Sequence, residues 1–145
     1  MVSRMSSMKK HLENLRGVSL FSGCSKKDLE RIAKAGDEIT RPAGTVLMEQ
    51  DKPGREAFVI MEGEVIVKRN NRKVATLGPG RVVGELSLID NGTRTATVVC
   101  TTECELFVID HRRFGGVIDD VPALSHKVMR SLAAKIRELD TKAYG

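Results

Sequence analysis

Apolar residues in the first part of the chain recur at helical spacing. Four of them fall on one face of a helix over 5–15: Met5, Met8, Leu12 and Leu15. A second helix is expected to begin after Ser25, which can cap it together with Asp28 three residues on. Gly36 is expected to end this helix. Its buried stripe comprises Leu29, Ile32 and Ala33.

Between 37 and 110 the pattern changes to short apolar segments separated by turn residues. Strands are expected around Ile39 and over 45–48, 57–61, 65–68, 74–77, 82–83, 95–100 and 105–109. Asn70 and Asn71 suit a hairpin turn, because asparagine tolerates the left-handed region. About eight short strands with turn signals every 8 to 12 residues predict a sandwich or a barrel.

The helical pattern returns after the strands. Asp110 can cap a helix over 111–118, and Pro122 permits a second start. In this last helix apolar residues recur every three or four positions, at Leu124, Val128, Leu132, Ile136 and Leu139. Such a stripe can cover a ligand, pack on the N-terminal helix or pair with a second copy, and burial in the core is the commonest use.

The chain of 145 residues is most simply one domain, with a helical lead-in over 1–36, strands over 37–110 and helices over 111–145. No apolar run approaches the roughly 18 residues needed to cross a bilayer. The first ten residues lack an apolar signal region, so we expect a cytoplasmic protein without membrane contact.

The cysteines and histidines give no metal-binding pattern. Cys24, Cys100 and Cys104 are odd in number and are expected to be reduced thiols. The three histidines are scattered, so no metal site is expected.

A net charge of +5 raises the question of nucleic-acid binding. However, the 24 basic and 19 acidic residues are spread along the chain, and one tyrosine and four phenylalanines leave little for stacking on bases. We therefore expect no nucleic-acid partner. The positive balance can instead attract anionic nucleotides.

The stretch 84–98 combines residues that suit an anion. Gly84 allows the backbone to approach a ligand closely. The first amides of a helical turn from Glu85 to Ile89 would carry partial positive charge. Arg94 adds a fork of donors that matches phosphate oxygens, and the Glu85 carboxylate can accept a hydrogen bond from a hydroxyl. A nucleotide has both groups.

This stretch resembles the phosphate-binding cassette of the cyclic nucleotide-binding domains of protein kinase regulatory subunits, cyclic nucleotide-gated channels and catabolite activator proteins. The matching residues are Gly84, Glu85, Leu86, Leu88, Arg94, Thr95, Ala96, Thr97 and Val98. Val83 and Thr93 depart from the family, which often has Phe and Pro there. The resemblance extends from about Val18 into the last helix. It implies an α+β fold, an eight-stranded β jelly roll (double-stranded β-helix) with N-terminal and C-terminal helices packed on it.

The resemblance also implies roles for these residues. Arg94 would pair with the cyclic phosphate, Glu85 would hold the ribose 2′-hydroxyl, and the amides around Leu86, Ser87 and Thr95 would complete a site that also includes Gly84 and Ala96. Thr95 has two interpretations: its hydroxyl bonds the phosphate or the base, or its β-branched side chain suits a strand. A residue of the last helix would lie over the base, and the candidates are Arg130, Lys135 and Tyr144.

The sequence shows no nucleophile elbow, no catalytic carboxylate pair and no Walker loop. We therefore expect a non-enzymatic sensor that responds to a cyclic nucleotide by movement of its C-terminal helix. The expected ligand is cAMP, with cGMP as the second choice. One alternative is a regulatory part of a larger channel or transcription factor. Another is a jelly-roll interaction module without a ligand. An effector protein of unspecified identity is expected as a partner, and a homodimer is one possibility.

Overall fold

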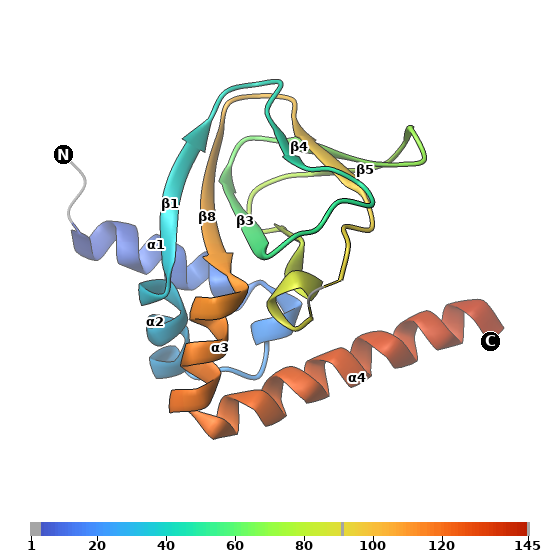
Figure 1. The fold of residues 1–145 in the computed structure, drawn as a ribbon. Helices are drawn as coiled ribbons and strands as arrows, with labels where there is room; N and C mark the ends of the chain where they lie inside the picture. The colour runs from blue at the N-terminus through green and yellow to red at the C-terminus, as the bar shows by residue number, and fades with distance from the viewer. Residues whose placement is uncertain (1–3, 91, 145) are drawn as a thin grey trace.

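The computed structural model describes residues 4–90 and 92–144. Two four-stranded antiparallel sheets stack on each other, and helices from both parts of the chain gather against one of them (Figure 1). The predicted eight-stranded jelly roll with N-terminal and C-terminal helices is confirmed.

The helices lie where the apolar periodicity predicts them. Their bounds are α1 Arg4–Arg16, α2 Lys26–Lys34, α3 His111–Asp120 and α4 Pro122–Tyr144, with short 3-10 turns η1 Ser19–Phe21 and η2 Glu85–Leu88. The predicted capping box is present in α2, because Ser25 Oγ accepts from the Asp28 amide at 3.1 Å and Asp28 Oδ2 accepts from the Ser25 amide at 3.0 Å. The side chains of Met5 and Met8 lie outside the described part of the structure.

Gly36 was expected to end the α2 helix as a left-handed C-cap, but the structure gives this glycine another role. Ala35 is the C-cap of α2, and Gly36 begins the first strand without a positive φ. A Cβ at Gly36 would lie 2.3 Å from Cζ of Phe107. Close packing against the phenylalanine ring, and not a left-handed cap, therefore requires glycine here.

The strands form two sheets, and each sheet is antiparallel throughout. Their bounds are β1 Gly36–Arg41, β2 Val46–Met48, β3 Glu56–Glu62, β4 Val65–Arg69, β5 Arg72–Leu77, β6 Val82–Val83, β7 Thr97–Cys100 and β8 Cys104–Asp110. The first sheet has the order β1-β8-β3-β6, and the second has the order β2-β7-β4-β5. Asn70 and Asn71 form the predicted β4–β5 turn with φ of 54° and 65°.

The first sheet is buried on both faces at its centre, so β3 is apolar over 57–61 and β8 is apolar over 106–109. Along β3, Ala57 and Val59 pack against the helices, whereas Phe58 and Ile60 pack between the two sheets. This alternation places one core under the helices and a second core inside the jelly roll. The ends of β3, β6 and β8 are thereby fixed, and they carry the loops described below.

The α4 helix consists of a packed half and an exposed half. Leu124 and Val128 are 0% and 3% exposed in the core beneath the helices, and Lys127 Nζ donates to Asp28 Oδ2 at 2.6 Å. This bond lowers the pKa of Asp28. Beyond the partly buried Leu132, however, Ile136 and Leu139 are 65% and 58% exposed. Core packing therefore accounts for the first half of the predicted stripe only.

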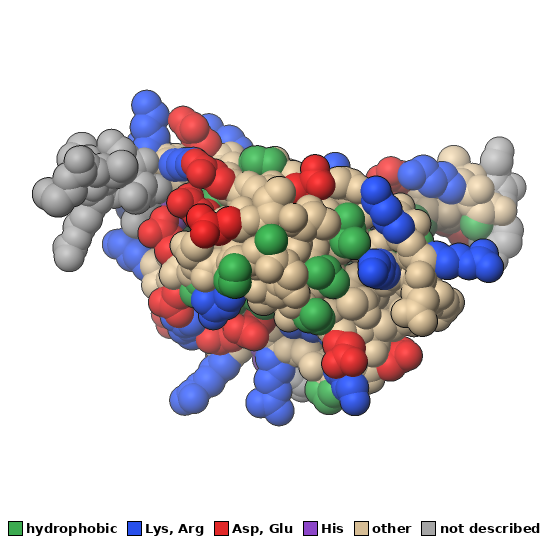
Figure 2. Space-filling model, turned by 90° about the horizontal axis from the view of Figure 1, so that it is seen from above, with side chains coloured by type: hydrophobic (Ala, Val, Ile, Leu, Met, Phe, Trp, Pro, Cys, Tyr) green, Lys and Arg blue, Asp and Glu red, His purple; other side chains and the backbone are tan. Residues whose placement is uncertain are grey.

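The surface gives two further facts about possible partners. No helix in the described ranges is both long enough and apolar enough to span a bilayer. On the face seen in Figure 2, acidic and basic side chains are interspersed. That face lacks the continuous basic stripe typical of nucleic-acid binding.

Truncation of Leu124 tests how α4 is attached. The Leu124→Ala variant is expected to lower the free energy of unfolding by about 2 to 5 kcal/mol, because the side chain is fully buried and leaves a cavity. The matched control is Arg137→Ala on the exposed half of the same helix, which should change this free energy by less than about 0.5 kcal/mol. Denaturant unfolding followed by circular dichroism measures both. Equal effects would contradict the division of α4 into two halves.

Candidate functional site

A cavity of about 150 Å³ lies where β6, η2 and the approach to β7 meet. Six of the residues predicted for the site line it: Gly84, Glu85, Leu86, Ser87, Arg94 and Thr95. Ala96 does not line the cavity and is buried, at 4% exposure. Residues 84–87 and 93–95 thus line the same cavity, as the sequence predicted for most of them.

Arg94 is the buried charge of this cavity. Its side chain is 7% exposed, and Nη1 donates to the Glu56 carbonyl at 2.7 Å and to Ser87 Oγ at 2.8 Å. No ion pair of the described residues includes this guanidinium. Burial lowers the pKa of Arg94, and the charge of the Glu56 carboxylate raises it to a smaller extent. The guanidinium therefore sits in the wall as a cation held by neutral acceptors, which leaves its charge available to an anion.

Two glycines make room for the guanidinium. A Cβ at Gly54 would lie 2.0 Å from Nε of Arg94, and one at Gly84 would lie 2.7 Å from Nη1. Gly84 also has a φ of 79°, a left-handed conformation that other residues rarely adopt. Glycine is thus needed at both positions, at Gly54 for space alone and at Gly84 for space and backbone conformation.

The η2 turn supplies backbone amides to the cavity. It is a 3-10 turn over Glu85–Leu88, with Ile89 as its C-cap, where the sequence predicted a helical turn up to Ile89. The Ser87 amide donates to the Gly84 carbonyl at 3.0 Å, and the amides of Glu85 and Leu86 have no acceptor inside the turn. Such amides at a helical start favour an anion.

Loop contacts fix the backbone of Arg94. Its amide donates to the Lys52 carbonyl at 2.8 Å, and its carbonyl accepts from the Asp51 amide at 2.9 Å. Pro53 and Thr93 form an adjacent bridge. The loop before β3 and the loop before β7 therefore hold each other in place, even though Thr93 stands where the family often has proline.

Three residues of the last helix were candidates to lie over the base. Lys135 is the one whose described contacts reach the cavity wall. Its Nζ lies 3.0 Å from Glu85 Oε1, and the Lys135 and Glu85 side chains are 49% and 20% exposed. Arg130 is exposed and has no hydrogen bond or ion pair with another described side chain. The Tyr144 side chain lies outside the described part of the structure.

Several residues of the site were not singled out from the sequence. Met48, Asp90 and Thr93 also line the cavity, and the Glu56 carbonyl binds Arg94. From the sequence alone, Gly54 indicates no more than a turn. Its proximity to Arg94 has no local sequence signal, because the two residues are brought together by the sheet.

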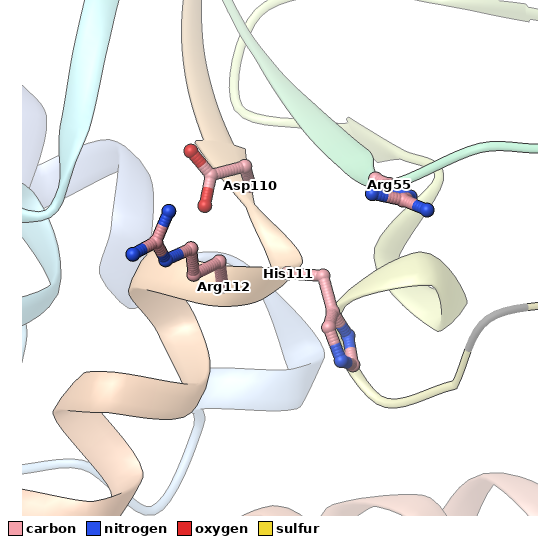
Figure 3. A pocket seen from close by; sticks show the side chains of 4 residues that line it. All are labelled: Arg55, Asp110, His111 and Arg112. Atoms are coloured by element: carbon pink, nitrogen blue, oxygen red, sulfur yellow. The ribbon is translucent and has the colours of Figure 1, made fainter.

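A second cavity of about 430 Å³ lies where β3 begins and β8 ends. Arg55, Asp110, His111 and Arg112 line it, and Figure 3 shows their side chains pointing in different directions. The His111 ring extends from the start of α3 towards η2, and its Nδ1 lies 3.1 Å from the Ser87 carbonyl oxygen.

Comparison with known proteins shows that the same region matches a protein family. The family model described as "Cyclic nucleotide-binding domain" matches residues 38–120, more than half of the chain. The "Cyclic AMP receptor protein" of Thermus thermophilus is 28% identical over 131 residues, which cover 87% of this chain and 61% of that protein. A cGMP-dependent protein kinase of Toxoplasma gondii is 30% identical over 129 residues, 88% of this chain and 12% of the kinase. The chain thus spans less than two thirds of either relative.

Solved structures agree with the fold. The N-terminal domain of a transcriptional regulator from Streptomyces coelicolor superposes with a TM-score of 0.81 at 28% identity, covering 88% of this chain and 95% of that one. The regulatory domain of Toxoplasma gondii PKA, crystallised with cAMP, gives 0.74 at 27% identity, covering 82% of this chain and 47% of that one. The chain therefore belongs to the cyclic nucleotide-binding domain family.

Proposed function

We propose that this chain is a non-enzymatic sensor that binds a cyclic nucleotide in the cavity beside η2, with cAMP preferred over cGMP. The observation that carries the proposal is the buried Arg94 guanidinium, which has no ion-pair partner among the described residues. A charge removed from water without a counterion is costly, so such a site gains most from an anion. A cyclic phosphate bound by Arg94 and the η2 amides supplies that charge.

The ion pair between Glu85 and Lys135 gives the proposed site a second part. A carboxylate has two oxygens and several lone pairs, so Glu85 can accept from Lys135 and from a ribose hydroxyl together. Lys135 also neutralises Glu85, whose charge would otherwise repel the phosphate. In this proposal Lys135 acts at the ribose, and not as a lid over the base.

Entry of a whole nucleotide requires movement. The cavity of about 150 Å³ is smaller than the roughly 300 to 1,000 Å³ typical of small-molecule sites. The barrel wall is fixed by sheet hydrogen bonds, whereas the exposed half of α4 reaches the site through Lys135. We therefore propose that this half of α4 shifts on binding.

The order of cAMP before cGMP rests on similarity. The Thermus relative is named for cAMP, and the Toxoplasma PKA domain was crystallised with it. A kinase named for cGMP is similar over as much of the chain. Because the relatives are longer, we also propose that the domain acts as the regulatory part of a larger assembly, whose effector segment or protein is unidentified. A ligand-free interaction module is the competing function.

Replacement of Arg94 tests the ligand assignment. Arg94→Ala should weaken cyclic nucleotide binding by tens to thousands of fold, or about 2 to 5 kcal/mol, because it removes the charge partner of a buried phosphate. Calorimetric titration with cAMP and cGMP measures this, with the exposed Arg81→Ala variant as a control of equal charge change. Thermal melts should show both nucleotides raising the midpoint of the wild type, and cAMP raising it more. Unchanged affinity in Arg94→Ala would refute the phosphate role, and a melt insensitive to both nucleotides would favour the interaction module.

Replacement of Lys135 tests the second part of the site. Lys135→Met should weaken cAMP binding by about two- to tenfold, because Glu85 loses its cationic donor beside a bound anion. The control is Lys142→Met, whose ammonium lies 3.4 Å from Glu138 of the same helix and away from the cavity. Both affinities come from titration calorimetry. Tighter binding by Lys135→Met would mean that the lysine obstructs the ligand.

The exposed half of α4 also supports a homodimer. Five residues follow the 3,4 spacing of a coiled-coil seam: Met129, Leu132, Ile136, Leu139 and Ala143. Three of them, Met129, Ile136 and Leu139, are more than half exposed. We propose that this seam pairs with the same seam of a second copy, because an exposed heptad stripe is self-complementary.

A charge placed in the seam tests the pairing. Light scattering should give a dimer for the wild type and a monomer for the Ile136→Lys, Leu139→Lys double variant, because two buried ammonium groups would face each other across the seam. The control is Thr141→Lys, which adds one lysine on the exposed helix surface outside the seam and should leave the dimer intact. A monomeric wild type would refute the proposal.

A further inference from the structure

We propose that His111 is a positioning residue for the nucleotide site, which holds η2 in its binding geometry through the Ser87 carbonyl and links it to α3. This inference rests on the proposed function, because it concerns the same cavity. His111 does not line that cavity and is not expected to touch the ligand.

Ser87 is the residue through which His111 acts. It is 6% exposed and contacts two other side chains, one through its hydroxyl and one through its backbone carbonyl. Its Oγ accepts from Nη1 of Arg94 at 2.8 Å, and its carbonyl oxygen lies 3.1 Å from Nδ1 of His111. Because a carbonyl can only accept, Nδ1 must carry the proton and donate. The guanidinium proposed to bind phosphate is therefore joined to the first residue of α3 through one serine.

His111 is itself held firmly. Its amide donates to the Arg55 carbonyl at 2.7 Å, and Asp110 caps α3 by accepting from the Arg113 amide at 2.7 Å. Phe114, one turn on, is 1% exposed in the core. Three separate contacts thus fix the helix start, so the imidazole is presented to η2 from a rigid base (Figure 3).

The η2 turn needs such a support. It is a four-residue 3-10 turn that starts from the left-handed Gly84, and short 3-10 turns have poor hydrogen-bond geometry. Leu88 anchors the turn in the core at 3% exposure, whereas Leu86 and Ile89, at 50% and 39% exposure, lie outside the core. Loss of the His111 donor would leave the carbonyl of the buried Ser87 without this partner, so the turn would rotate to find another. Both the amides and Ser87 Oγ would then move relative to Arg94.

The test compares two side chains of almost equal size at position 111. His111→Asn keeps an N–H on the atom bonded to Cγ, where Nδ1 is attached in histidine, whereas His111→Leu has no donor. The cavity of about 430 Å³ beside His111 leaves space for either side chain. In ligand-free protein, hydrogen exchange reports on the amides of Ser87 and Ile89, which donate to Gly84 and Leu86. Calorimetric titration with cAMP gives the affinity of each variant.

We expect His111→Leu to bind cAMP about two- to tenfold more weakly and to exchange the η2 amides faster, and His111→Asn to restore both properties. A general loss of stability would affect the two variants alike, and thermal melts without ligand record it. Equal affinity of wild type and His111→Leu, or equal weakening in both variants, would overturn the positioning role alone. A wild type that binds neither cAMP nor cGMP would overturn the proposed function and this inference with it.

Discussion

The site depends on the cost of burying the Arg94 guanidinium without an ion-pair partner among the described residues. A cation in this position is stable only if polar groups surround it, and the Glu56 carbonyl and Ser87 Oγ satisfy one of its nitrogens. Neutral acceptors orient the guanidinium, and the Glu56 carboxylate compensates its charge only in part, because burial still lowers the pKa of Arg94. Gly54 and Gly84 lack side chains at the two points where a Cβ would collide with it. The glycines around Arg94 are therefore explained by one buried charge, and the proposal of an anionic ligand rests on the same charge.

The jelly roll provides the rigidity that this arrangement requires. The first sheet packs on the second sheet with one face and on the helices with the other, so β3, β6 and β8 are fixed on both sides. The loops that leave these strands then bond to each other, as between Lys52 and Arg94. A cavity wall built on such strands keeps its geometry without a ligand.

The α4 helix divides into a half that is packed in the core and a half that is exposed. Leu124 and Val128 hold the first half of α4 in the core, whereas the half that carries Lys135 has no buried apolar residue. The contacts of this half with the cavity are polar and exposed, and such contacts exchange readily for a ligand or a second copy. At the other side of the site, His111 joins η2 to the start of α3. The helices thus reach the candidate site from two directions.

The sequence by itself determined what depends on neighbours in the chain. The Ser25 and Asp28 capping box, the Asn70-Asn71 turn, the number of strands and the stretch 84–95 were predictable, because caps, turns and alternation are set by local sterics and hydrogen bonds. Tertiary structure alone decided the contacts of that stretch. Arg94 meets the Glu56 carbonyl 38 positions away, Glu85 meets Lys135 50 positions away, and Ser87 meets His111 24 positions away. It also decided where the α4 stripe leaves the core, because periodicity gives a helix an apolar face but not the extent of the surface that covers it.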